Sequence, residues 1–202
     1  MKSDHVLERL DRLIESRSIL GHPFYQAWKN GELTREQLAI YATVYYPHVA
    51  SFPGYLERIL SQATDDTIRA EIEQNLEDER FNPAPHPELW LDFAEGLGLG
   101  REAVAGASPH PAASRMVTTF ENLAERGVAR GLAALYAYES QQPEVSREKA
   151  RGLSENYGLE DSRTLAYFDV HAETDMVHRN GERRALKRCL ENGASGETIL
   201  NS

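Results

Sequence analysis

The stretch His171-Ala-Glu-Thr-Asp175-Met-Val-His178 lies inside the longest helical pattern of the chain, which extends from Ser162 to about Leu190. On a helix that advances about 100° per residue, positions four and seven residues further on lie about 40° and about 20° from the first. His171, Asp175 and His178 therefore project from one face as imidazole, carboxylate and imidazole. Such a donor set suits iron, manganese or zinc, and the alternative is a solvated polar face with hydrogen-bonded histidines.

The rest of the chain shows the same helical periodicity. Apolar residues recur at the spacing of amphipathic helices, Thr34 with Gln37 forms the signature of a capping box, and no alternating strand pattern persists. The expected helices are an N-terminal one closed by Gly21, then Pro23–Asn30, Arg35–Ala63, Asp65–Glu79, His86–Gly96, Ala113–Arg126, Val128–Gln142, Glu144–Tyr157 and Ser162–Leu190. This pattern predicts an all-α bundle of seven or eight helices, with one domain over residues 1–190 and a flexible C-terminal tail over residues 191–202.

Composition excludes several classes of protein. The chain has 202 residues, a net charge of −10 and one cysteine, Cys189, which rules out an internal disulfide and a thiolate-held metal cluster. The negative charge argues against a nucleic-acid surface, which needs clustered basic residues. No apolar window is long enough to span a bilayer, and the N-terminus carries no export signal. We therefore expect a cytoplasmic protein that binds neither nucleic acid nor membrane.

Three further residues are candidate metal ligands. Glu79 closes one expected helix and His86 opens the next, so a tight reversal between them brings both side chains to the same end of the bundle. The alternative for Glu79 is a solvated acid at a helix end. Glu139 follows the apolar run Gly131–Tyr138 and is expected to be buried, where a carboxylate needs a partner or a metal. Its alternative is a buried helix-capping role.

Together the candidates offer three carboxylates and three imidazoles. Two divalent ions carry four positive charges, so three carboxylates with a bridging oxygen species leave a nearly neutral site that tolerates burial. The Glu-x-x-His pairs of ferritin-like bundles are absent, because neither Glu79 nor Glu139 is followed by histidine three residues on. The sequence thus predicts a dinuclear metal centre on a different scaffold. The predicted ligands are Glu79, His86, Glu139, His171, Asp175 and His178.

Several segments, spread over residues 5 to 190, carry a resemblance to a known family. They are His22–Thr34, Tyr45-Tyr46, Phe52-Pro53, Glu79 and His86, Ala133–Gln141, Arg147–Leu153, and Tyr167-Phe168 ahead of His171, Asp175 and His178. With these segments the chain resembles the haem-oxygenase-like di-metal oxidases. Within them it is most similar to the CADD-like group, named for a chlamydial protein associating with death domains.

The resemblance implies a haem-oxygenase-like bundle without haem, which binds an Fe/Fe or Mn/Fe pair and uses dioxygen with an unidentified reductant. The implied activity is formation of para-aminobenzoate for folate synthesis from one of the enzyme's own tyrosines. Matching positions make Tyr25 the sacrificed residue and Lys149 the amino donor, while Tyr41 and Tyr167 line the site. Family habit also implies a homodimer. Without the resemblance, Tyr25 is interpreted as a core aromatic and Lys149 as an exposed helix lysine.

Other functions stay as alternatives. A cofactor-free oxidase like pyrroloquinoline-quinone synthase does not need three acids that converge with three histidines. A thiaminase-like hydrolase needs a central cysteine nucleophile, whereas Cys189 lies near the chain end. A di-iron oxidase that acts on an external small molecule and a non-catalytic helical binding protein are the remaining alternatives. The chlamydial type member has a longer C-terminal extension, so we expect no death-domain partnership here.

Overall fold

The structure, a computed structural model, describes residues 3–202 and contains, over that range, helices without strands. Eight of the helices have eleven residues or more, which agrees with the predicted bundle. The helices are α1 (Ser3–Glu15), α2 (Pro23–Lys29), α3 (Arg35–Gln62), α4 (Asp66–Phe81), α5 (His86–Gly96), α6 (Arg101–Ala105), α7 (Pro111–Glu125), α8 (Val128–Glu139), α9 (Gln142–Tyr157), α10 (Ser162–Glu191) and α11 (Gly196–Leu200), with a 3-10 turn at Ile19–Gly21.

Local sequence signals place most helix ends. Thr34 and Gln37 form the expected capping box at the start of α3, because each side chain accepts a hydrogen bond from the other residue's backbone N–H. Asp65 caps α4 by accepting from the backbone of Thr67 and Ile68. The short helix α6 was not predicted, because five residues are too few to show a helical period.

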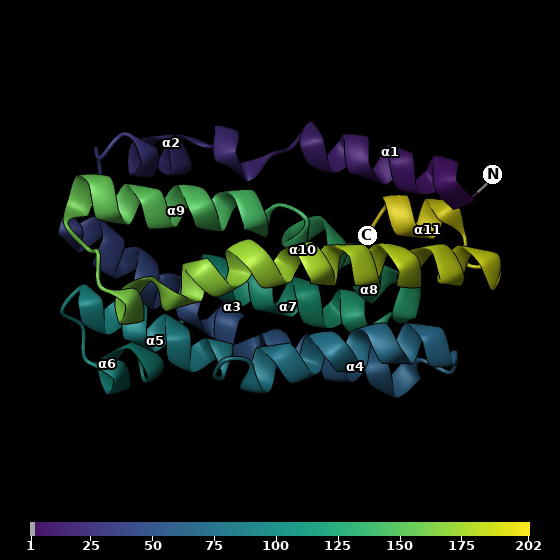
Figure 1. Ribbon diagram of the computed structural model, residues 1–202. Helices are drawn as coiled ribbons and strands as arrows, with labels where there is room; N and C mark the ends of the chain where they lie inside the picture. Colours follow the sequence, from purple (N-terminus) through teal and green to yellow (C-terminus); the bar gives the residue numbers. More distant parts are fainter. Residues whose placement is uncertain (1–2) are drawn as a thin grey trace.

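Helix α10 runs through the middle of the bundle and holds it together (Figure 1). It packs against α4, α5, α8 and α9, while α1 and α2 lie on the side of α9. Any side chain on the inward faces of α4, α5 and α8 can therefore meet the long face of α10. Among residues 3–202, no helix combines the length and apolar character needed to cross a bilayer.

Two apolar clusters fill the interior and leave a polar layer between them. One cluster contains Leu56 and Leu186, and the other contains Trp90 and Phe168. On α10 the segment 171–178 lies between Phe168 of one cluster and Leu186 of the other. Its His171, Asp175 and His178 are nevertheless buried. The packing therefore encloses a polar site inside an otherwise apolar bundle.

The C-terminal residues differ from the expected flexible tail. Gly193 has a positive φ of 97°, which turns the chain back after α10, and α11 then packs against α1 and α8. Ile199 is 1% exposed and belongs to the apolar cluster that contains Leu186. A five-residue helix with one anchoring side chain has too little periodicity to be recognised in the sequence, and only the bundle surface stabilises it.

We expect Ile199→Ala to lower the free energy of unfolding by about 2–4 kcal/mol, because it removes a fully buried side chain and leaves a cavity. Ile40→Ala is the matched control, because Ile40 is 57% exposed and its truncation costs less than about 0.5 kcal/mol. Chemical denaturation monitored by circular dichroism measures both values. Equal effects of the two substitutions would show that α11 is not anchored.

Candidate metal centre

The six predicted ligands converge from four helices. Glu79 lies in the last turn of α4, His86 begins α5, Glu139 ends α8, and the remaining three lie on α10. They form two groups of three, namely Glu79 with His86 and His171, and Glu139 with Asp175 and His178. Within each group one ligand-capable atom per residue lies within 4.8 Å of the others, and all six residues are buried. The interpretation of Glu79 as a solvated acid is therefore wrong.

In the first group one ring nitrogen of each imidazole faces the carboxylate of Glu79. His86 Nδ1 lies 3.0 Å and His171 Nε2 3.9 Å from Glu79 Oε1. The other ring nitrogens donate to backbone carbonyls, from His86 Nε2 to Asn82 at 3.2 Å and from His171 Nδ1 to Tyr167 at 2.6 Å. These bonds fix the tautomer of each ring and leave one lone pair per imidazole facing inward.

The second group is oriented by polar side chains. His178 Nδ1 lies 3.6 Å from Glu139 and 3.5 Å from Asp175, while its Nε2 lies 3.1 Å from the carboxylate of Asp78. Asn75 donates through Nδ2 to both oxygens of Glu139, each at 3.1 Å. Asp78 and Asn75 thus hold the two side chains from outside, as outer partners of metal ligands do. Neither residue was predicted from the sequence, since neither has a metal-ligand spacing.

The two groups face one small enclosed cavity of about 10 Å³. Members of both groups line it, namely Glu79 and His171 from the first, and Glu139 and Asp175 from the second. The aromatic side chains of Tyr138 and Tyr167 complete part of the wall. The cavity is about large enough for one water molecule, and it lies between the two groups of candidate ligands.

The chemistry of the donor set fits divalent cations. His86 Nδ1, His178 Nδ1 and both Asp175 oxygens are buried without a hydrogen-bond partner, although buried polar atoms normally have one. Burial raises the pKa of Asp175 to about 7, and the negative charge of Glu139 adds to the effect. Burial alone lowers the pKa of His178, but the nearby carboxylates of Asp175 and Glu139 raise it to about 11. The buried carboxylates are therefore stabilised by nearby positive charge, which bound metal ions would supply in place of protons.

A fourth carboxylate, Glu182, was missed by the sequence analysis. It lies on α10 four residues after His178, is 4% exposed, and neither of its oxygens has a hydrogen-bond partner. Burial raises its pKa well above the usual range, and the adjacent charge of Glu139 raises it further. Continuing the spacing of His171, Asp175 and His178 by one more turn would have found it. Four carboxylates match the four charges of two divalent ions.

The other predicted residues form a second polar site among aromatic rings. Lys149, on α9, is 4% exposed, so its interpretation as an exposed helix lysine is wrong. Its Nζ donates to the hydroxyl of Tyr41 at 2.7 Å and lies 5.1 Å from the ring centroid of Tyr25. Burial lowers the pKa of Lys149 to about 7, because no carboxylate compensates the ammonium charge. The side chain is therefore largely a neutral amine above pH 7.

Phenols connect this lysine site to the metal-binding layer. The rings of Tyr41 and Tyr45 stack with centroids 5.3 Å apart, and the Tyr45 hydroxyl lies 2.6 Å from that of Tyr138. Tyr167 stacks on His171 with centroids 4.0 Å apart. Burial raises the pKa of Tyr167 well above the usual range, and the negative charges of Glu79 and Asp175 add to the effect. The sequence analysis assigned Tyr45 no role in the site, so its hydroxyl contact with Tyr138 is a finding of the structure.

Comparison with known proteins agrees with this site. Residues 39–201 match the family described as iron-containing redox enzymes. A 4-aminobenzoate synthase of Chlamydia pneumoniae is 42% identical over 182 residues, which cover 90% of this chain and 81% of that relative. A 4-aminobenzoate synthase of Nitrosomonas europaea is 36% identical over 210 residues, which cover 99% of this chain and 85% of that relative.

The fold has a solved counterpart as well. A TenA homologue from Pseudomonas syringae superposes with a TM-score of 0.83 at 16% identity, over 98% of this chain and 87% of that one. The chain belongs to the family of iron-containing redox enzymes. It is an oxidoreductase with the TenA-like, haem-oxygenase-like helical fold. The alternative of a non-catalytic binding protein is thereby set aside.

We expect His171→Asn to lose at least one metal equivalent per chain, because it removes an imidazole from the group with Glu79 and His86. His110→Asn is the control, since His110 is exposed and serves as the N-cap of α7, a role that asparagine fills well. Elemental analysis of protein purified from iron-supplemented culture measures the metal content. Unchanged metal content in the His171 variant would remove that residue from the ligand set.

The lysine site predicts a pH dependence of stability. Below pH 7 Lys149 is protonated in both states, and the buried cation imposes its full cost on the folded state. Between pH 7 and 10.5, the pKa of this lysine in the unfolded state, only the unfolded state holds the proton. The free energy of unfolding therefore rises with pH by up to about 1.4 kcal/mol per pH unit. Denaturation from pH 6 to pH 9 should show this rise in the parent relative to Lys149→Met.

The exposed lysine provides the control for that measurement. Lys29→Met removes a lysine that is 50% exposed and paired with Glu148, so its stability difference from the parent should stay constant over the same range. A flat difference for Lys149→Met as well would mean that Lys149 keeps an ordinary pKa in the folded protein.

Proposed function

We propose that this protein is an oxygen-dependent dinuclear-metal oxidase that forms 4-aminobenzoate from the side chain of Tyr25, with nitrogen from Lys149. The product is that of the two relatives described above, which are 4-aminobenzoate synthases. Its carbon skeleton fits a tyrosine source, because the ring and Cβ of tyrosine together have the seven carbons of a benzoate. The single observation that carries the proposal is a buried amine placed 5.1 Å from the ring of Tyr25.

The two groups of ligands would hold the metal pair, either Fe/Fe or Mn/Fe. When bound in the reduced form, such a pair supplies the activation of dioxygen, which amino-acid side chains cannot perform. The residues around it keep the site dry and fixed. Asn75 and Asp78 orient Glu139 and His178, and the apolar clusters on both sides exclude water from the layer.

Lys149 provides the nitrogen because it is neutral and held in place. An amine with a pKa of about 7 has an available lone pair at physiological pH, whereas an ordinary lysine is almost fully protonated. The hydrogen bond to Tyr41 and the surrounding rings fix its position. In the overall conversion the Cα–Cβ bond of Tyr25 breaks and Cβ is oxidised to a carboxyl carbon. The Nζ–Cε bond of Lys149 breaks as its nitrogen replaces the phenolic oxygen, which leaves as water, and Cε is oxidised to an aldehyde carbon. Dioxygen is the oxidant, and an external reductant supplies further electrons.

The intervening phenols link the oxidant to its target. Tyr138 and Tyr167 line the cavity shared by the two ligand groups, and Tyr45 and Tyr41 continue from Tyr138 toward Lys149. Buried phenols with raised pKa values keep their protons, so each of these hydroxyls can donate a hydrogen bond to the next group. Loss of an electron from Tyr25 at the far end of this series would begin the cleavage of its side chain.

Isotope labelling tests the source of the product. Protein grown with ring-labelled tyrosine and 15N-labelled lysine is purified, loaded with iron, reduced and exposed to air in the presence of unlabelled amino acids. We expect 4-aminobenzoate with a labelled ring and labelled nitrogen, together with a loss of mass at Tyr25 in the intact protein. Unlabelled product would show that an external molecule is the substrate.

Tyr25→Phe should abolish product formation and keep the metal content, because Tyr25 lies in none of the ligand groups. Tyr46→Phe is the matched control, since Tyr46 is only half-buried and belongs to neither the lysine site nor the ligand groups. Liquid chromatography with mass spectrometry measures 4-aminobenzoate from each variant. Full product formation by Tyr25→Phe would refute the assignment of Tyr25.

A further inference from the structure

A large cavity lies beside the lysine site, outside the metal-binding layer. It has a volume of about 520 Å³, which is within the range of small-molecule sites, and lies between α1, the start of α9 and α10. The wall combines charged, hydroxyl and aromatic side chains, among them Glu15, Tyr136, Ser140, Glu144, Arg179 and Arg183. No step of the proposed reaction uses any of these side chains.

The cavity continues to the reacting residues. A smaller cavity of about 170 Å³ is lined by Tyr25 and Lys149, and it shares three wall residues with the large one. The shared residues are Leu20, Glu144 and Val145. They form the neck that stands between the lysine site and the large cavity. The neck is bordered by the segment before α2, which the N–H of Ile19 ties to the side chain of Gln141 at 3.0 Å.

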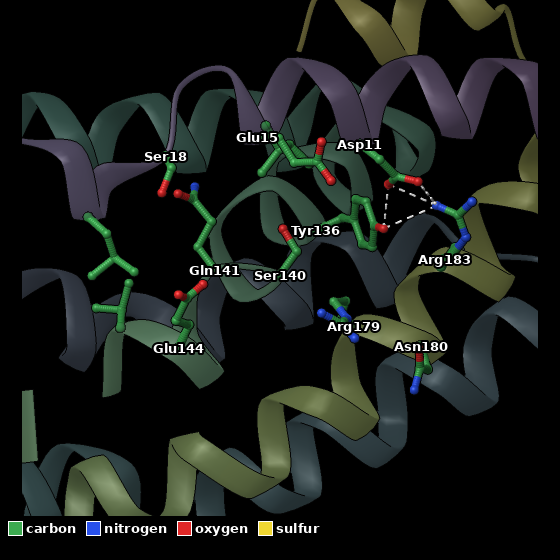
Figure 2. A pocket seen from close by; sticks show the side chains of 13 residues that line it. Asp11, Glu15, Ser18, Tyr136, Ser140, Gln141, Glu144, Arg179, Asn180 and Arg183 are labelled. Carbon is green, nitrogen blue, oxygen red and sulfur yellow. Dashed lines mark hydrogen bonds and ion pairs between the residues drawn. The ribbon is translucent and has the colours of Figure 1, made fainter. Parts of the chain in front are cut away.

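The charged groups of the large cavity fall into two sets, as Figure 2 shows. Arg183 pairs with Asp11 at 2.6 Å, and both contact the hydroxyl of Tyr136, so these groups satisfy one another. Across residues 3–202, by contrast, the side chains of Glu15, Glu144 and Arg179 have no ion pair or hydrogen bond. The hydroxyl of Ser140 is also buried without a partner. These groups are available to a ligand.

A guanidinium and a carboxylate on different walls of one cavity suit a ring that has an anion at one end and an amine at the other. A guanidinium binds a carboxylate through paired hydrogen bonds, and a carboxylate accepts from an aromatic amine. Arg179 comes from α10 and Glu144 from α9, so the two ends of the ligand are recognised from different helices. A free amino acid carries both charges on one carbon, whereas Arg179 and Glu144 belong to different helices.

We propose that this cavity binds 4-aminobenzoate after its formation, with the carboxylate paired to Arg179 and the amine donating to Glu144. The inference rests on the proposed function and adds the site where the product is held on leaving. The orientation agrees with the chemistry at the neck. Glu144 lies next to the cavity that contains Lys149, which delivers the nitrogen, whereas Arg179 lines only the outer cavity.

Direct binding tests this site independently of turnover. Metal-loaded Tyr25→Phe protein, which forms no product of its own, is titrated with 4-aminobenzoate, benzoate, aniline and tyrosine, and affinity is measured by equilibrium dialysis or ligand-observed NMR. We expect saturable binding of 4-aminobenzoate at one site per chain. Benzoate and aniline should each bind at least about tenfold more weakly, because each lacks one of the two charge-assisted contacts.

Substitutions of Arg179 and Glu144, which contact the two ends of the ligand in this proposal, test the location of the site. Arg179→Gln should lower the affinity for 4-aminobenzoate and for benzoate at least about tenfold and leave the affinity for aniline unchanged. Glu144→Gln should remove the preference for 4-aminobenzoate over benzoate. Arg126→Gln is the control, because Arg126 is exposed at the end of α7 and lies outside the cavity. Because Arg179 follows His178, metal content is measured for each variant, and Glu144→Gln gives an independent answer if that content falls.

The outcomes separate this inference from the proposed function. Absence of saturable binding, unchanged affinity in Arg179→Gln with full metal content, or tighter binding of tyrosine than of 4-aminobenzoate overturns the product site, even if labelled product forms in the parent. Binding that depends on Arg179 and Glu144 supports the site, even if the isotope experiment traces the product to an external molecule.

Discussion

Charge compensation inside the bundle is the constraint on which the rest of the structure depends. Four carboxylates, those of Glu79, Glu139, Asp175 and Glu182, are buried with three imidazoles between two apolar clusters. A buried charge without a partner destabilises the folded state. Removing one partner of a buried ion pair, for example, lowers the free energy of unfolding by about 3–5 kcal/mol. Two divalent cations balance four acids, so the same side chains that would destabilise an empty apolar core form a metal centre.

The same apolar interior disfavours the charged form of Lys149. The acids of the metal-binding layer stand beside imidazoles, whereas Lys149 faces aromatic rings and phenol hydroxyls without a carboxylate. The ammonium charge is therefore the form that burial disfavours, and the amine loses its proton near pH 7. One low-dielectric interior thus contains a layer of candidate metal ligands and, beside it, an amine that is largely neutral above pH 7.

Particular residues show how far the sequence could predict the site. The spacing on α10 and the apolar run before Glu139 were sufficient to identify ligand candidates that the fold then brings together. Lys149 was different, because its neighbours Arg147, Glu148 and Arg151 make the local sequence resemble an exposed face. Its burial depends on α2 and α3, which come from the other end of the chain. Ile199 was missed for a similar reason, since α11 is too short to have a pattern of its own.

The sequence by itself determined the helical class, most helix ends and the face of α10 that carries His171, Asp175 and His178, because helical geometry depends only on nearby residues. Tertiary structure alone decided the division of the ligands into two groups, the addition of Asn75, Asp78 and Glu182, and the cavity beside Lys149. The physical reason is that such contacts join side chains from different helices. Which helices meet is set by the packing of the whole bundle, and no local spacing records it.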